Sequence, residues 1–238
     1  MKSKTMTMKT SNSIMLSFLV FLFGGIFVLF IAAKIHSLND SKVIWTWQEK
    51  ALSPFSVVVA EPGAEFSVQY DQSSRIGLSL QLGDTCSFPH FEIRNDTLFV
   101  YSFAGRVKQQ SVIVFGSSIK TIQGKENSTI QLKQYEGDTL MVKLNKSVFK
   151  HYPDNSQHNN FSLILFASES NIQMGGASIQ TMEIHLNKTD MTGIGTSISN
   201  LTGVLNDHST LLIGKIRKIN LEIDSTSTFN SMKSWKAI

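Results

Sequence analysis

The chain of 238 residues is long enough for one sizeable domain with additional segments. Hydrophobic residues make up 42% of it and charged residues 17%, which excludes an intrinsically disordered chain. The net charge is +4, but three lysines in the first nine residues supply most of it, which leaves 19 basic and 18 acidic residues in the remainder. Because this remainder has no basic stripe with interleaved aromatic residues, we expect no binding of nucleic acid.

The first predicted element is a transmembrane anchor over residues 14–36, preceded by a cytoplasmic tail over residues 1–13. Its core, IMLSFLVFLFGGIFVLFIAA, carries no charge. As a helix it spans about 30 Å, the hydrocarbon thickness of a bilayer. A cleaved signal peptide is the alternative, but its apolar core is about 7–15 residues long and ends in a small-residue cleavage site. The end of this segment, FIAAKIHS, does not match such a site.

The charges beside the anchor predict its orientation. Lys2, Lys4 and Lys9 precede the span without an acidic neighbour, and the positive-inside rule places such residues in the cytoplasm. Lys34 and Lys42 follow the span and weaken this bias without reversing it. We therefore expect a single-pass protein of the cytoplasmic (inner) membrane with the bulk of the chain in the periplasm.

A juxtamembrane linker is expected over residues 37–51, although the alternation in VIWTWQ also suits a strand. The rest of the chain, 52–238, is expected to form one all-β domain. Its first half shows period-two alternation, with turn signals at Glu61-Pro62-Gly63 and Asn95-Asp96. The clearest strands of its central part are predicted at residues 112–114, 130–132 and 140–144.

The C-terminal half repeats itself about every twenty residues. Four segments, FSLIL, MEIHL, LTGVL and LEIDS, each precede a polar turn, and three short apolar pieces end in Gly175, Gly195 and Gly214. In MEIHL, Ile184 is predicted to face inward and His185 outward. Such a unit cannot bury its apolar face alone but can do so when it stacks on its neighbours.

This repeat predicts a single-stranded β-helix, or solenoid, after one transmembrane helix. Equivalent residues of successive coils are expected to form ladders, such as Leu163 over Ile184 over Gly203 over Ile223. The glycines are expected at corners where φ is positive or where two backbones approach closely. The basic run Lys215–Lys218 is expected to be a solvated turn.

The order of these elements resembles that of the head GIN domain family of bacterial envelope proteins, also described as auto-transporter adhesin domains. The residues that carry the resemblance are FSVVV and FSV near residues 55–68, NDTLFVYS from Asn95, and DHSTLLIGKIRKINLEIDSTSTF from Asp207. The similarity covers roughly residues 52–229. It implies a β-helix-like fold and an extracytoplasmic location, and it brings no catalytic residues with it.

Neither histidine nor cysteine patterns point to a metal site. His151 and His158 are placed in a polar loop, and His185 and His208, about one coil apart, are expected to be solvated. None of the six histidines has a partner at metal-ligand spacing. Cys86 is the only cysteine, which excludes an internal disulfide and predicts a packed thiol.

Acidic residues of the late coils are the remaining candidates for chemistry. Glu183 and Glu222 are expected on the outer face two coils apart, with Thr202 between them. Paired carboxylates act as acid and base in sugar hydrolysis, so a β-helix enzyme acting on envelope carbohydrate is the alternative function. The other acids of this set are Asp190, Asp207 and Asp224. Because they are scattered, we predict no catalytic, cofactor-binding or metal-binding residue.

We therefore expect a non-catalytic, membrane-anchored binding, adhesion or scaffolding domain of the cell envelope that needs no cofactor. Its partner is expected to be an envelope polymer or a protein, because its outer face is rich in serine, threonine and asparagine and carries little net charge. A self-assembling homo-oligomeric module is a further alternative. A solenoid has open strand edges, unless the C-terminal SMKSWKAI caps the last coil.

Overall fold

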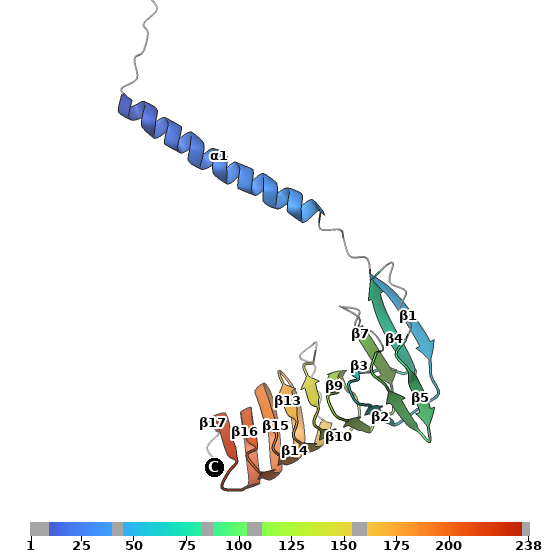
Figure 1. Ribbon diagram of the computed structural model, residues 1–238. Coiled ribbons are helices and arrows are strands. Elements are labelled where there is room, and N and C mark those ends of the chain that lie inside the picture. The colour runs from blue at the N-terminus through green and yellow to red at the C-terminus, as the bar shows by residue number, and fades with distance from the viewer. Residues whose placement is uncertain (1–9, 40–44, 82–87, 104–110, 154–160, 235–238) are drawn as a thin grey trace, which may run out of the picture. The chain divides into compact units, whose positions relative to one another are not determined.

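The computed structural model of the chain describes residues 10–39, 45–81, 88–103, 111–153 and 161–234 (Figure 1). The chain divides into two compact units, residues 1–44 and residues 45–238. Several residues singled out in the sequence lie outside the described residues: Lys2, Lys4, Lys9, Lys42, Cys86, His158, Trp235 and Lys236.

The first unit contains one helix, α1 (Thr10–Asn39). Its segment Ile14–Lys34 has a mean hydropathy of 2.9, and none of its most apolar window is buried within the structure. A helix that is apolar on all sides requires an apolar environment. The length and composition of this helix suit a membrane anchor, and they equally suit a signal sequence near the N-terminus.

The second unit consists of strands joined by turns. Its bounds are β1 (Trp45–Ala51), β2 (Val57–Ala60), β3 (Glu65–Tyr70), β4 (Arg75–Gln81), β5 (Phe91–Arg94), β6 (Thr97–Val100), β7 (Ser111–Gly116), β8 (Thr121–Gly124), β9 (Thr129–Gln134), β10 (Thr139–Asn145), β11 (Val148–His151), β12 (Phe161–Ser168), β13 (Asn171–Met174), β14 (Ser178–Asn187), β15 (Asp190–Asn206), β16 (Thr210–Ile223) and β17 (Thr228–Ser234). Together they confirm the predicted all-β fold.

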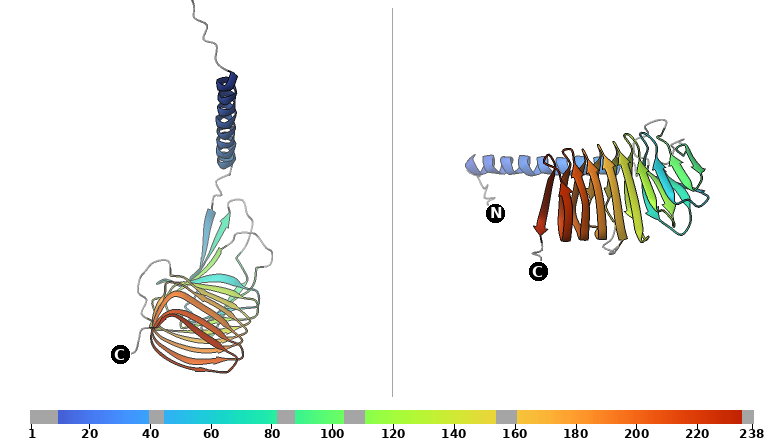
Figure 2. Two further views of the ribbon diagram at one scale, coloured as in Figure 1. Left: turned by 90° about the vertical axis from the view of Figure 1, so that its left-hand side faces the viewer. Right: turned by 90° about the horizontal axis from the view of Figure 1, so that it is seen from below.

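From β8 onward the chain winds as a parallel β-solenoid, as predicted. One face stacks β8, β10, β12, β14 and the second halves of β15 and β16. The other face stacks β9, β11, β13, the first halves of β15 and β16, and finally β17. Figure 2 shows these coils side by side as a row of parallel strands.

Side-chain alternation along these strands builds the core. Ile184 is fully buried, whereas 39% of the His185 side chain is exposed, which confirms the predicted inward and outward residues. Successive inward residues stack along the solenoid axis, for example Leu163 on Met182 on Leu201. Burying each large apolar side chain contributes roughly 1.5–3 kcal/mol, so these columns supply much of the stability of the stack.

The predicted ladder through Leu163, Ile184, Gly203 and Ile223 is wrong at both ends. Ile184 does stack on Gly203, but Leu165 lies below it and Leu221 lies above Gly203. Both errors are shifts of two residues along a strand. A two-residue shift keeps every side chain on the same face, so alternation in the sequence does not reveal it.

The N-terminal end of the domain is built differently, because β1, β4 and β7 pair antiparallel. The expected linker over 37–51 is therefore too long: residues 45–51 form β1, paired with β4 over its whole length. Trp47 packs edge-on against Phe115, with 6.2 Å between ring centroids. The alternation in VIWTWQ thus reflects a strand that starts the folded unit.

Turn signals in the sequence are confirmed where the backbone adopts positive φ. Gly63 has a φ of 74° between β2 and β3, and Asn95 and Asp96 have φ of 46° and 63° between β5 and β6. Two consecutive residues with positive φ give the tight turn that suits an antiparallel hairpin. At the corner of a later coil, Gly195 has a φ of 78°, as expected for the repeated glycines.

Candidate functional site

Outward side chains of the face that contains β8, β10, β12 and β14 lie in register from coil to coil. One outward column runs Gln123, Lys143, Phe166, His185 and Val204. Because parallel strands lie about 4.8 Å apart, the residues of this column lie side by side. The column thus forms a continuous strip along the outside of the solenoid.

A shallow groove of about 370 Å³ follows this strip. At the end of the groove formed by β12 and β14, the rings of Phe166 and His185 stack nearly parallel, with centroids 4.7 Å apart and planes at 7°. Phe166 is 38% exposed, which is unusual for a phenylalanine in a well-packed domain. The groove is lined by Gln123, Gly124, Lys125, Lys143, Leu144, Asn145, Phe166, Ala167, Ser168 and His185.

Charges at the groove are few and mostly paired. The His185 Nε2 lies 2.9 Å from the Glu183 Oε1, and the Lys125 Nζ donates to the Glu61 Oε1 at 2.7 Å. Lys143 is exposed and makes no ion pair with the described residues. The groove therefore offers one aromatic pair, several amide and hydroxyl groups, and one ammonium group without a carboxylate partner.

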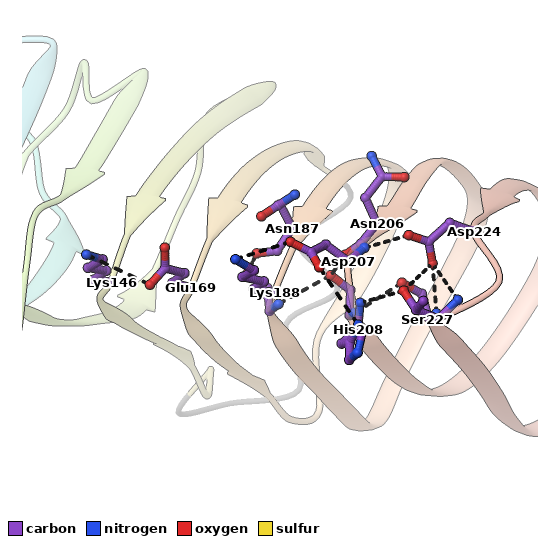
Figure 3. Close-up of polar contacts among 12 residues, drawn as sticks. Lys146, Glu169, Asn187, Lys188, Asn206, Asp207, His208, Asp224 and Ser227 are labelled. Carbon is purple, nitrogen blue, oxygen red and sulfur yellow. Dashed lines mark hydrogen bonds and ion pairs between the residues drawn. The ribbon is translucent and has the colours of Figure 1, made fainter.

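Beside the groove, the strands end in a corner whose polar residues repeat in every coil (Figure 3). Asn145, Ser168, Asn187 and Asn206 stack in register at the strand ends. Residues that follow them carry alternating charge, so ion pairs link the coils. The Nζ–carboxylate distances are 3.9 Å for Lys146–Glu169 and 3.3 Å for Lys188–Asp207.

Buried hydroxyl groups hold this corner in place. The Ser170 Oγ accepts a hydrogen bond from the Ser147 N–H at 3.2 Å, and the Thr189 Oγ1 accepts one from the Ser170 N–H at 3.3 Å. In the same way, the Ser209 Oγ accepts a hydrogen bond from the Thr189 N–H at 3.3 Å, and the Ser227 Oγ accepts one from the Ser209 N–H at 3.1 Å. Residue separations along this ladder are 23, 19, 20 and 18, so the corner stays fixed while coil length varies.

Before four of these residues, Ser147, Ser170, Thr189 and Ser209, lies a non-glycine residue with positive φ. These are Lys146, Glu169, Lys188 and His208, with φ of 50°, 49°, 47° and 65°. Lysine and glutamate rarely adopt positive φ, so the sequence did not predict these turns. The signal that could have located the corner is the recurring serine or threonine after a polar residue, since it sits at one place in every coil.

Glu183 and Glu222, the carboxylates considered for the alternative enzyme, do not lie in one column. Thr202 stacks on Glu183 as expected, but the next residue of that column is Asn220. Glu222 instead stacks on Val204, in the neighbouring outward column. The two-residue register shift described above accounts for this error as well.

The other acidic candidates are engaged in contacts between coils. The Thr210 hydroxyl donates to Asp190, and Asp207 pairs with Lys188. Asp224 accepts a hydrogen bond from the Asp207 N–H at 2.6 Å, and this bond holds the pKa of Asp224 well below its usual range. These contacts assign the three carboxylates to the corner, where they help to close the turns.

Histidines that looked equivalent in the sequence occupy different environments. His151 lies inside the core at the end of β11 and not in a polar loop, with its Nδ1 3.0 Å from the Leu132 carbonyl oxygen. Burial lowers the pKa of His151. His185 stacks on Val204, while His208 lies in the turn beside Asp207. Within the described residues, no three His, Cys, Asp or Glu side chains lie close enough to hold a metal ion.

The basic run Lys215–Lys218 is not a turn. It lies inside β16, where Ile216 is buried while Lys215, Arg217 and Lys218 are exposed. The run is therefore part of the repeat itself, with its basic side chains on the outside of a strand.

No family model and no curated protein sequence matches the chain. Solved structures that resemble it include a "putative adhesin" from Bacteroides fragilis, with 10% sequence identity over 81% of this chain and 98% of that one and a TM-score of 0.49. A "putative adhesin" from Parabacteroides distasonis has 12% identity over 81% of this chain and 96% of that one, with a TM-score of 0.46. A "putative lipid binding protein" from the same species has 11% identity over 81% and 98%, with a TM-score of 0.38. Membership of the head GIN domain family stays a prediction.

Proposed function

We propose that the chain is a non-catalytic binding module of the cell envelope, held at the membrane by α1, and that its solenoid binds an envelope polymer or a protein partner. The observation that carries this proposal is the outer groove, with the stacked rings of Phe166 and His185 at its β14 end. An aromatic pair at the surface offers apolar contact area at low entropic cost. Such a pair, surrounded by a polar rim, is the usual anatomy of a binding surface.

The chemistry of the groove favours a polyhydroxylated polymer. Gln123, Asn145 and Ser168 provide donors and acceptors that suit sugar hydroxyl groups, and the aromatic pair suits the C–H face of a sugar ring. Lys143 adds one positive charge that suits a carboxylate or phosphate substituent. A single unpaired ammonium group gives little affinity for DNA, because nucleic-acid binding requires many neutralised phosphates.

Binding outside the cell requires the solenoid to lie on the extracytoplasmic side. We expect a protease added to intact spheroplasts to remove a tag placed at the C-terminus, since Lys2, Lys4 and Lys9 retain the N-terminus in the cytoplasm. A cytoplasmic marker protein resists the protease in the same sample. Digestion of the tag only after lysis would place the solenoid in the cytoplasm and overturn the proposal.

Binding itself is measured with the full chain in detergent micelles. We expect the chain to be retained by immobilised envelope polysaccharide at low affinity and not by double-stranded DNA at physiological salt. The same fractions are monitored for released sugars. If sugars are released, and replacement of Glu183 or Glu222 by Gln abolishes this release, the proposal of a binding module is wrong and the alternative enzyme is supported.

A further inference from the structure

The last coil of the solenoid is only half covered. β17 pairs with β16 at residues 210–213 and at 215–216. Beyond that point, residues 218–223 of β16 pair with β15 on one side and with no other described residue. The seven-residue stretch 217–223, here named the terminal edge, is thus a free strand edge within the described part of the chain.

Two of the three inward side chains of the terminal edge, Ile219 and Ile223, remain exposed although they continue core columns, and Leu221 between them is partly buried against the core. Leu201 is 1% exposed, while Ile219, the next residue of its column, is 48% exposed. Leu205 is fully buried, while Ile223 above it is also largely exposed. The apolar column therefore ends in a surface that no described residue covers.

The backbone of the terminal edge also has groups available for pairing with another strand. The Asp224 N–H donates to the Leu205 carbonyl at 3.1 Å, toward the preceding coil. Because successive residues of a strand direct their N–H and C=O groups to opposite sides, those of Ile219, Leu221 and Ile223 point away from that coil. Such a row of free donors and acceptors pairs readily with another strand.

The sequence of the terminal edge, RKINLEI, is complementary to itself in the antiparallel direction. We propose that the terminal edge pairs with the same edge of a second copy of this chain, about a two-fold axis at Asn220. Lys218 of one copy then lies opposite Glu222 of the other, and Ile219 lies opposite Leu221. Both charged residues are exposed and make no ion pair within the described part of the chain.

Because the two copies are related by a two-fold axis, each of these contacts occurs twice in the dimer. Opposite charges directly across an antiparallel pair are favourable and like charges are unfavourable, so the Lys218–Glu222 arrangement selects this register. Self-pairing uses the terminal edge of both copies, so a third copy cannot add at the same edge. The dimer joins two solenoids at their last coils and continues the core columns from one copy into the other.

Charge exchange tests this pairing on the full chain in detergent micelles, with molar mass followed as a function of concentration by sedimentation velocity. The wild-type chain dimerises. Lys218→Glu and Glu222→Lys each weaken the dimer by about tenfold or more, because each substitution places two like-charge pairs across the axis. The double variant Lys218→Glu/Glu222→Lys restores the complementarity and dimerises like the wild type.

Disulfide trapping tests the position of the axis. In a Cys86→Ser background, Asn220→Cys is expected to cross-link two chains under mild oxidation, because residue 220 faces itself at a non-hydrogen-bonded pair with Cα atoms about 4.5 Å apart. Thr202→Cys is the matched control, one coil earlier in the same outward column, and it stays uncross-linked.

Three results would overturn the proposal. One is a wild-type chain that stays monomeric at all concentrations. Another is a dimer that the single charge exchanges leave unchanged, which would assign association to α1 or to another surface. The last is a monomer that dimerises only after removal of residues 235–238, which would mean that the chain covers its own edge.

Discussion

Replacing Ile184 by aspartate is expected to lower the free energy of unfolding by about 3–5 kcal/mol, because the carboxylate would be buried without a partner. Ile184 is fully buried at the centre of the solenoid, between Leu165 and Gly203 of the adjacent coils. Neither neighbour offers a side-chain donor for the charge. The loss is measured from the urea midpoint of the detergent-solubilised chain, followed by circular dichroism.

His185 provides the matched control, since it is the next residue of the same strand and faces outward. His185→Asn, which avoids a second carboxylate beside Glu183, is expected to change the free energy of unfolding by less than about 1 kcal/mol. Equal losses for the two substitutions would contradict the inward and outward assignment of β14, and with it the register of the central coils.

Gly203→Ala is the second substitution with a large expected effect. Gly203 has a φ of 141°, and a Cβ atom there would lie 1.9 Å from the Ile184 carbonyl oxygen. The coils must separate locally to accept the methyl group, while the backbone retains a conformation that alanine disfavours. We expect a loss of about 3–4 kcal/mol in the free energy of unfolding from the steric overlap and the strained φ together.

Gly176→Ala separates these two causes. Gly176 also has positive φ, at 69°, but a Cβ atom there would meet no atom within 4 Å. Only the backbone strain remains, and about 1 kcal/mol is expected from it. A loss at Gly203 no larger than the loss at Gly176 would mean that the coils at β14 and β15 are further apart than the structure has them.

Period-two alternation predicted the strands of the later coils. MEIHL alternates over one short strand, and Ile184 and His185 lie where this alternation places them. The repeat of about twenty residues and the polar turns then predicted that such strands stack as coils. Each of these inferences rests on residues close together in the sequence, where local geometry decides which face a side chain occupies.

Contacts between coils could not be predicted in the same way. Coil lengths range from 18 to 23 residues, so counting twenty residues from Leu163 or Gly203 leads to the wrong neighbour. The structural register is set at the corners, where Ser147, Ser170 and Thr189 are fixed by buried hydrogen bonds. That ladder depends on positive φ at ordinary residues, which tertiary contacts impose against local preference.

The candidate site depends on the same register. Phe166 and His185 are nineteen residues apart in the sequence, and nothing in either segment alone indicates that their rings stack. A shift of two residues in the pairing of β12 and β14 would place Ile164 beside His185 and separate the two aromatic rings. Sequence reasoning predicted a polar outer face but not the aromatic pair in the groove.

The most direct test of the proposed function is to compare the binding of envelope polysaccharide by the wild-type chain, Phe166→Ala and Ile194→Ala. Ile194 is the matched control, because it is also an exposed apolar residue and lies outside the groove. We predict that Phe166→Ala weakens binding about tenfold or more, that Ile194→Ala changes it less than about twofold, and that both variants remain folded, with a cooperative urea transition. Equal binding by all three chains would contradict the groove as the binding surface.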